Sequence, residues 1–159
     1  MTLVRLALSA AAAAALLTTA PAQPLPRPTA RPRPKLEPVA ETKLLMEGLL
    51  QSNFRGLEGH LKVRPADDTA WTFARGQALL IAETGNLLML RPPRTAGQDA
   101  WMGFAIDLRD KATRLARTIA ARDHDGGRLG LADLATTCNR CHQTFGQPAR
   151  VVPFADPDG

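Results

Sequence analysis

The sequence predicts an all-α domain, an antiparallel up-down-up-down bundle of four helices. Three observations lead to this fold class. The 159-residue chain has no Tyr, five Phe and two Trp, and it is rich in Ala, Leu and Arg, a composition that favours helices over strands. Apolar residues recur at three- and four-residue steps in four stretches between residues 41 and 147. The breaks between these stretches are short, and short connections favour antiparallel neighbours.

The first two predicted helices are bounded by recognisable stop and start signals. The first runs from about residue 41 to 59, with Gly56 and Gly59 as the residues that can end it. The second runs from about residue 69 to 90, with Asp67 or Asp68 as its N-cap and a pair of prolines after it. The positions expected to face the core are Leu45, Met46, Leu49, Leu50, Phe54, Leu57, Trp71, Ala74, Ala78, Ile81, Gly85 and Leu88.

The third and fourth predicted helices continue the same apolar period. Thr95 and Gln98 have the spacing of a capping box for the third helix, and the Asp-Gly-Gly turn at residues 125–127 is expected to break the chain after it. The fourth helix is predicted from about residue 128 to 145. The positions expected to face the core are Trp101, Phe104, Ala105, Leu108, Ala112, Leu115, Ile119, Leu131, Leu134, Cys138, Cys141 and Phe145.

The N-terminal segment has the features of an export signal. Residues 1–22 contain one basic residue, Arg5, followed by an apolar stretch and then small residues at the A-x-A positions 20–22. The apolar stretch is shorter than the ~20 residues that a membrane span needs. We therefore expect a signal peptide, a periplasmic or otherwise exported protein, and no stable membrane span after cleavage.

Two further segments lie outside the predicted bundle at residues 41–147. Residues 23–40 contain six prolines and four basic residues, a composition typical of a disordered, extended tether. Residues 148–159 are expected to form a flexible tail. The formal net charge of +5 favours an acidic protein partner. Nucleic acid is not an expected partner, because the basic residues are dispersed and the chain carries an export signal.

The pattern that indicates a chemistry is Cys-Asn-Arg-Cys-His at residues 138–142. C-x-x-C-H is the attachment signature of c-type haem. On a helix at ~100° per residue, Cys138, Cys141 and His142 share one face, so that two thiols can bond to the two vinyl groups of one porphyrin while the imidazole reaches its iron. We therefore expect one covalent haem c, with His142 as an iron ligand whose second ring nitrogen needs its own partner.

Other uses of two cysteines fit the sequence less well. A thioredoxin-like dithiol expects a preceding strand and a βαβ setting, and neither is predicted here. A zinc site needs four ligands, whereas Cys138, Cys141 and His142 supply three, and His60 and His124 stand at no recognisable spacing. A disulfide across this motif would close a very small loop and stabilise little. Both remaining histidines are expected on the surface.

With the motif near its C-terminal end, the chain resembles the class II cytochromes, the cytochrome c-prime superfamily. Class I cytochromes c place the motif near the N-terminus of the mature chain instead. The likeness covers about residues 41–147 and is best over residues 134–145, where Phe145 follows His142 by three positions. The resemblance implies a four-helix bundle, thioether bonds at Cys138 and Cys141, proximal ligation by His142, a periplasmic location and, often, a homodimer.

The resemblance also implies that the first helix passes over the distal face of the haem, as it does in this superfamily. An apolar residue there leaves the iron five-coordinate, and a Met there gives low-spin relatives. Met46 is therefore a candidate sixth ligand to the iron, with core filling as the alternative. Without ligation by Met46, Leu49 or Leu50 would shield an open position. The other methionines considered are Met89 and Met102, which are less well placed.

These expectations favour a one-electron carrier rather than an enzyme. The alternative is a five-coordinate haem protein that binds a small gas such as nitric oxide or carbon monoxide. Peroxidase-like chemistry is less well supported, because the sequence shows no recognisable acid–base pair for the distal side of the haem. Arg75 is a candidate partner for a haem propionate, with an ion pair to Glu83 or exposure to solvent as the alternatives. Gly76 and Gly85 are expected to allow close approach of a helix or the porphyrin.

Overall fold

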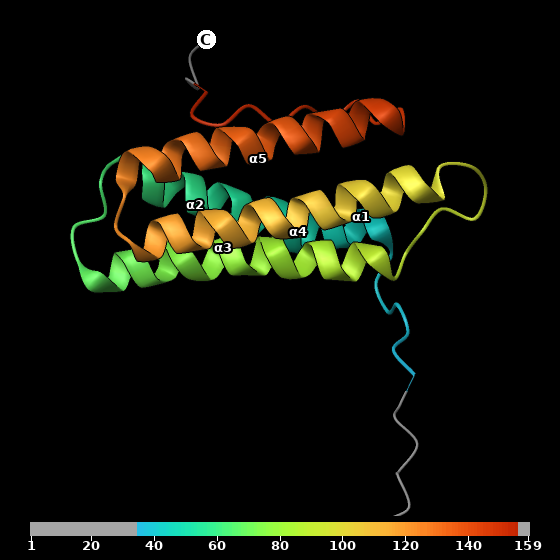
Figure 1. Cartoon of the computed structure of the whole chain (residues 1–159), viewed down its shortest axis with the longest axis horizontal. Coiled ribbons are helices and arrows are strands. Elements are labelled where there is room, and N and C mark those ends of the chain that lie inside the picture. The colour runs from blue at the N-terminus through green and yellow to red at the C-terminus, as the bar shows by residue number, and fades with distance from the viewer. Residues whose placement is uncertain (1–34, 156–159) are drawn as a thin grey trace, which may run out of the picture. The chain divides into compact units, whose positions relative to one another are not determined.

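The computed structural model describes residues 35–155, and this part of the chain contains helices and no strands. The prediction of an all-α fold is confirmed for these residues. The helical elements, shown in Figure 1, are α1 (Thr42–Leu45), the π-helical η1 (Met46–Gln51), α2 (Ser52–Lys62), α3 (Asp68–Met89), α4 (Gln98–Ala120) and α5 (His124–Thr144). The predicted signal peptide, most of the predicted tether and residues 156–159 lie outside the described residues. None of the described helices is long and apolar enough to cross a membrane.

The first predicted helix is a continuous helical segment that changes type twice. Elements α1, η1 and α2 follow one another without a break and extend past the predicted end at Gly59 to Lys62. Gly59 does not end the helix, because it does not adopt the left-handed conformation of a C-terminal glycine. Gly56 instead faces α3, where an added Cβ would overlap the side-chain amide of Gln77. The π-helical turn, which begins at Met46, was not predicted.

The ends of α3 and α4 show one expected and one unexpected cap. Asp67 caps α3, since its Oδ1 accepts a hydrogen bond of 2.8 Å from the backbone N–H of Ala70. The capping box predicted for α4 is wrong. Gly97 is the N-cap, with a left-handed backbone (φ +90°), and the side chain of Gln98 donates to the carbonyl of Pro93 at 3.0 Å. A glycine is favoured here because it takes a positive φ without strain.

Helix α5 begins four residues before its predicted start at residue 128. Asp123 is its N-cap, and the Asp123 Oδ1 atom accepts a hydrogen bond of 2.9 Å from the backbone N–H of Gly126. This cap turns the Asp-Gly-Gly sequence at residues 125–127, expected to be a break, into the first turn of the helix.

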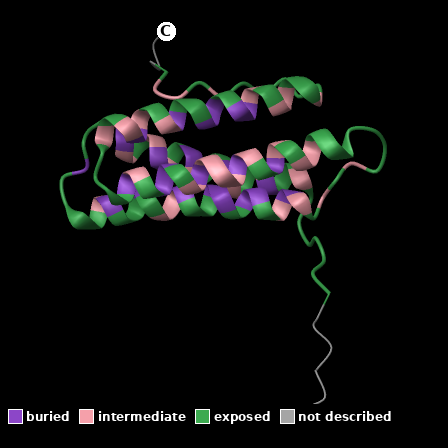
Figure 2. Cartoon of the chain, in the orientation of Figure 1, coloured by how far each residue is buried: buried purple, intermediate pink, exposed green. Residues whose placement is uncertain are grey.

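The core forms where the apolar faces of the helices meet, as the purple residues in Figure 2 show. Most positions predicted to face inward are buried, and the largest fully buried apolar side chains are Leu57, Leu61, Ile81, Ile119, Leu131 and Leu134. The predicted inward positions that remain partly exposed are Met46, Leu49, Trp101, Phe104, Cys141 and Phe145. All but Leu49 line cavities at one site, which is described below.

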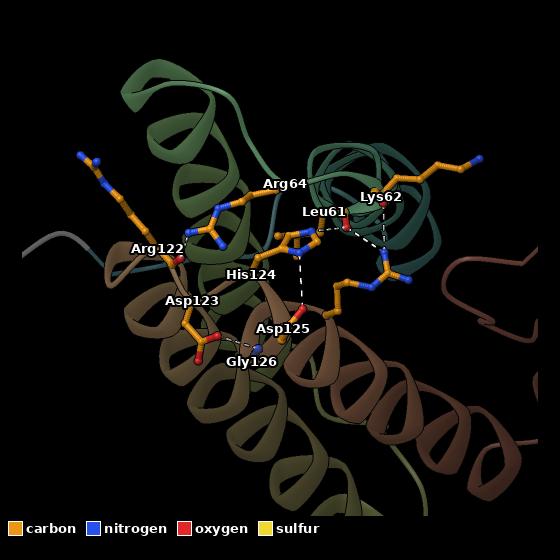
Figure 3. A network of polar contacts seen from close by, with 9 residues as sticks. Leu61, Lys62, Arg64, Arg122, Asp123, His124, Asp125 and Gly126 are labelled. Atoms are coloured by element: carbon orange, nitrogen blue, oxygen red, sulfur yellow. Dashed lines mark hydrogen bonds and ion pairs between the residues drawn. The ribbon is translucent and has the colours of Figure 1, made fainter.

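A polar network joins the end of α2 to the start of α5 (Figure 3). His124 Nε2 lies 3.1 Å from the carbonyl oxygen of Leu61, and Arg128 Nη1 donates to the same carbonyl at 2.9 Å and to that of Lys62 at 3.2 Å. The Arg128 guanidinium satisfies the last carbonyls of α2 and complements its dipole. His124 is therefore half-buried at the start of α5, not on the surface as predicted.

His60 also departs from its predicted place. It lies within α2 rather than beyond the first helix, and it is half-buried. Its ring stacks on Phe73 of α3 with ring centroids 6.4 Å apart. His60 and His124 both lie outside the linings of the cavities described below.

We expect Arg128→Ala to lower the free energy of unfolding by about 1–2 kcal/mol, because two carbonyls of α2 lose a charged donor. Chemical denaturation followed by circular dichroism measures the change. Arg114→Ala on the exposed face of α4 is the matched control. Equal effects of the two substitutions would show that the Arg128 contacts do not stabilise the fold.

Candidate functional site

The C-x-x-C-H motif lies in the last two turns of α5, in the helical setting predicted for it. Cys138 is buried, and Cys141 and His142 are partly exposed. Both cysteines are free thiols. Burial, reinforced by the proximity of Cys141, raises the pKa of the Cys138 thiol to about 12, and burial also raises the pKa of Cys141. The thiols are therefore protonated at neutral pH, unlike the low-pKa cysteines of dithiol redox enzymes.

Two cavities meet at this motif. The smaller, about 40 Å³, is apolar and includes both thiols in its wall. The larger, about 700 Å³, lies among the first helical segment, the end of α5 and residues 147–152. The residues that line both are Met46, Leu50, Trp101, Cys141 and His142. A volume of this size falls within the range of about 300–1,000 Å³ that is typical of cofactor and ligand sites.

The π-helical turn η1 contributes Met46 and Leu50 to the lining of both cavities. Met46 begins this turn, and the buried Leu50 follows one turn later. π-helical turns inside helices are frequent at functional sites. Leu49, Met89 and Met102 line neither cavity. Among the methionines of residues 35–155, the fold thus brings Met46 to the motif.

Aromatic side chains form a rigid side of the site. Trp101 packs edge-on against Phe145, with ring centroids 5.3 Å apart, and Phe104 packs edge-on against the same ring at 6.4 Å. The indole N–H of Trp101 donates to the carbonyl of Leu88 at 2.8 Å, which fixes the ring. Trp71, in contrast, is a buried core residue that lines neither cavity.

The imidazole of His142 is oriented by the segment that follows α5. Its Nδ1 atom lies 2.7 Å from the carbonyl oxygen of Ala149. A carbonyl can only accept, so Nδ1 carries the proton in this hydrogen bond, and Nε2 of the neutral ring has a free lone pair. This is the arrangement in which histidine binds a metal through Nε2.

The contacts of this C-terminal segment were not predicted. Residues 148–155, expected to belong to a flexible tail, are hydrogen-bonded to α5 and α2. Two bonds join the side chain of Asn139 to the main chain of Val151. The only signal in the sequence was an amide side chain between the two cysteines, and it does not reveal a partner 12 residues away.

Charged side chains lie around the larger cavity, where Lys43, Glu47, Arg55, Glu58 and Arg150 contribute to the lining. Lys43 and Glu47 form an exposed ion pair at 3.9 Å. Arg75, considered as a partner for a propionate, lies on α3 and lines neither cavity. Basic residues are thus available at this site, but they differ from the one that was predicted.

The site brings two thiols, one imidazole and one thioether to neighbouring cavities. Within residues 35–155, no three side chains of the His, Cys, Asp and Glu types are grouped so as to hold a metal ion. Apolar and aromatic side chains make up much of the lining of the smaller cavity, which also includes both thiols and the thioether of Met46. No protein-family model, curated protein or solved structure matches the chain.

Proposed function

We propose that the protein is an exported mono-haem c-type cytochrome that carries one electron. The observation that supports this most directly is that one cavity, about 700 Å³ in volume, is lined by Cys141 and His142 of α5 and by Met46 of η1, and that it adjoins the pocket of Cys138. The proposal includes an antiparallel up-down-up-down bundle like that of the cytochrome c-prime superfamily, which the short connections between successive helices support.

Each residue has a distinct role in this proposal. Cys138 and Cys141 would hold the haem through thioether bonds, and His142 Nε2 would ligate its iron because Nδ1 is occupied by Ala149. Met46 would supply the sixth ligand. When bound, the haem supplies reversible one-electron exchange between ferric and ferrous iron. Trp101, Phe104 and Leu50 would exclude water from the group and hold it rigidly.

Ligation by Met46 predicts the effect of one substitution. In Met46→Ala, ferric protein should change from low-spin to high-spin, lose the sulfur-to-iron charge-transfer band and show a lower reduction potential, because methionine ligation raises that potential. Optical and paramagnetic resonance spectra measure the change. Met89→Ala is the matched control, since Met89 lines neither cavity. An unchanged Met46→Ala spectrum would exclude Met46 as a ligand.

A second function, binding of nitric oxide or carbon monoxide at a five-coordinate haem, has support from Leu50. This side chain is buried and lines both cavities from η1, as an apolar distal residue would. Wild-type ferric protein with a high-spin spectrum, together with reversible binding of carbon monoxide by the ferrous form, would favour this function over electron transfer.

The charge of the chain supports an acidic redox partner. The formal net charge is +5, and Lys43, Arg55 and Arg150 lie around the larger cavity, where electrons would enter and leave. Such a surface attracts an acidic protein and raises the rate of encounter. A periplasmic location, supported by the signal sequence at residues 1–22, and a homodimer, implied by the family resemblance, complete the proposal.

A further inference from the structure

The chain turns back after α5 and runs along that helix (Figure 1). The turn lies at Gly146, which has a left-handed backbone (φ +64°), and the backbone N–H of Gln147 donates to the carbonyl of His142 at 2.8 Å. This reversal is the left-handed helix end for which glycine is favoured. It brings residues 149–151 beside the motif from which the chain has just departed.

Asn139 fastens this returning segment to α5 with two hydrogen bonds. Its side-chain Nδ2 donates to the carbonyl of Val151 at 2.8 Å, and its Oδ1 accepts from the backbone N–H of Val151 at 2.8 Å. Asn139 thereby satisfies both polar groups of one residue, as a paired strand would. We call residues 147–154 the strap and this pair of bonds the Asn139 clamp.

The clamp and the histidine contact lie on the same side of α5. Asn139 and His142 are three residues apart, a spacing at which helical side chains are neighbours. The strap residues that they contact, Val151 and Ala149, are two apart, as on one edge of an extended segment. Fixing Val151 therefore also fixes where the Ala149 carbonyl lies relative to the imidazole.

A second anchor holds the far end of the strap. The backbone N–H of Phe154 donates to Glu58 of α2, and the guanidinium of Arg128 lies 3.9 Å from the centre of the Phe154 ring. Between this anchor and the turn at Gly146, the strap is hydrogen-bonded to side chains of α5 through the Asn139 clamp and through the His142 contact itself. The position of the Ala149 carbonyl thus depends on Asn139.

We infer that Asn139 is a positioning residue for the proposed iron ligand. By clamping Val151 it holds the Ala149 carbonyl against His142 Nδ1, which keeps the proton on Nδ1 and presents Nε2 to the haem iron. The hydrogen bond also makes the imidazole a more basic ligand. This role depends on the proposed function, whereas the clamp itself does not depend on bound haem.

A more basic ligand stabilises ferric over ferrous iron, so the clamp lowers the reduction potential. Asn139→Ala removes both bonds and should shift the potential of the haem-loaded, full-length protein to a more positive value. Gln143→Ala is the matched control, because Gln143 is an exposed neighbour of His142 on the same helix. Its potential should equal that of the wild type in a spectroelectrochemical titration.

Val151→Pro tests the same contact from the strap. Proline removes the N–H that donates to Asn139 and leaves the C-x-x-C-H motif unchanged. Its potential should shift in the same direction as that of Asn139→Ala. This variant keeps the test decisive if Asn139→Ala, which alters the motif itself, fails to load haem. An unchanged potential in Val151→Pro would overturn the positioning role.

Limited trypsin digestion tests whether the Asn139 clamp holds the strap, and this test does not require bound haem. Cleavage after Arg150 requires the Arg150–Val151 bond to leave α5 and enter the protease, and the clamp holds Val151. Loss of two hydrogen bonds should raise the rate of this cleavage about tenfold or more in Asn139→Ala, and not in Gln143→Ala. Mass spectrometry detects removal of residues 151–159.

The two readouts separate failure of this inference from failure of the proposed function. Faster cleavage with an unchanged potential would show that Asn139 only holds the strap, and equal cleavage rates would show that the clamp does not hold it. Either result overturns the inference. A wild-type protein that carries no haem would overturn the proposed function, while the cleavage rates of the haem-free chains would still report whether the clamp exists.

Discussion

Simultaneous replacement of Cys138 and Cys141 by Ala is expected to abolish covalent attachment of haem. The two thiols adjoin the cavity that also contains His142, and the proposal assigns them the two thioether bonds. Without them, any haem in the cavity would be held by ligation and packing alone and would be lost on denaturation. The measurement is haem content after denaturing electrophoresis and intact mass, for protein made in a host that matures c-type cytochromes.

Single substitutions and a neighbouring control sharpen this result. Cys138→Ala should still retain one thioether through Cys141, so that part of the haem remains attached. Thr136→Ala should retain haem fully, because Thr136 is exposed on α5 and its hydroxyl donates only to the carbonyl of Ala132. Haem that stays attached to the denatured double variant would contradict the proposed role of the thiols.

Gly85→Ala should produce the largest loss of stability from adding a single methyl group. A Cβ at this position would come within 2.8 Å of the carbonyl oxygen of Ala105 and 2.9 Å of the backbone nitrogen of Arg109. Both atoms belong to the backbone of α4, so they cannot turn away as a flexible side chain can. Helices α3 and α4 must separate, and overpacking of this kind costs about 1–3 kcal/mol. Chemical denaturation measures the loss.

Separation of α3 from α4 in Gly85→Ala should also change the packing of the candidate site. Leu88 lies one turn beyond Gly85 and lines the smaller cavity, and its carbonyl accepts the hydrogen bond of Trp101. A shift of α3 away from α4 should therefore loosen the aromatic wall as well as lower stability.

Gly76→Ala on the same helix is the matched control for this prediction. No atom lies within 4 Å of a Cβ added at Gly76. Alanine has the higher helix propensity, so this variant should be more stable than the wild type by up to about 1 kcal/mol. Changes of the same sign in the two variants would contradict the close approach of α3 and α4 at Gly85.

The helices could be predicted because their signals are local. The three- and four-residue apolar period is a property of each helix by itself, and the N-cap of α3 was predicted to within two neighbouring residues, of which Asp67 is the cap. The capping box predicted for α4 is wrong because Gly97 takes the N-cap position with a left-handed backbone conformation, in place of Thr95. The π-helical turn at Met46 has no comparable signal, because its residues follow the same apolar pattern as an ordinary helix.

In the candidate site, too, the residues of a local motif could be predicted, whereas contacts between distant segments could not. Cys138, Cys141 and His142 form one contiguous motif, so their shared face follows from helix geometry. That Met46 lines the same cavities depends on packing between helices, and Met46 was a candidate only through a family resemblance. The strap could not be predicted, because its contacts join residues far apart in the chain, such as Glu58 and Phe154, which are 96 positions apart.

Above all, we propose that this chain carries one covalently bound haem. The most direct test is the intact mass and absorption spectrum of the full-length gene product, purified from a host that matures c-type cytochromes and then denatured. We predict a coloured polypeptide whose mass exceeds that of its processed amino-acid chain by one haem. A colourless product with the mass of the amino-acid chain alone would contradict the account.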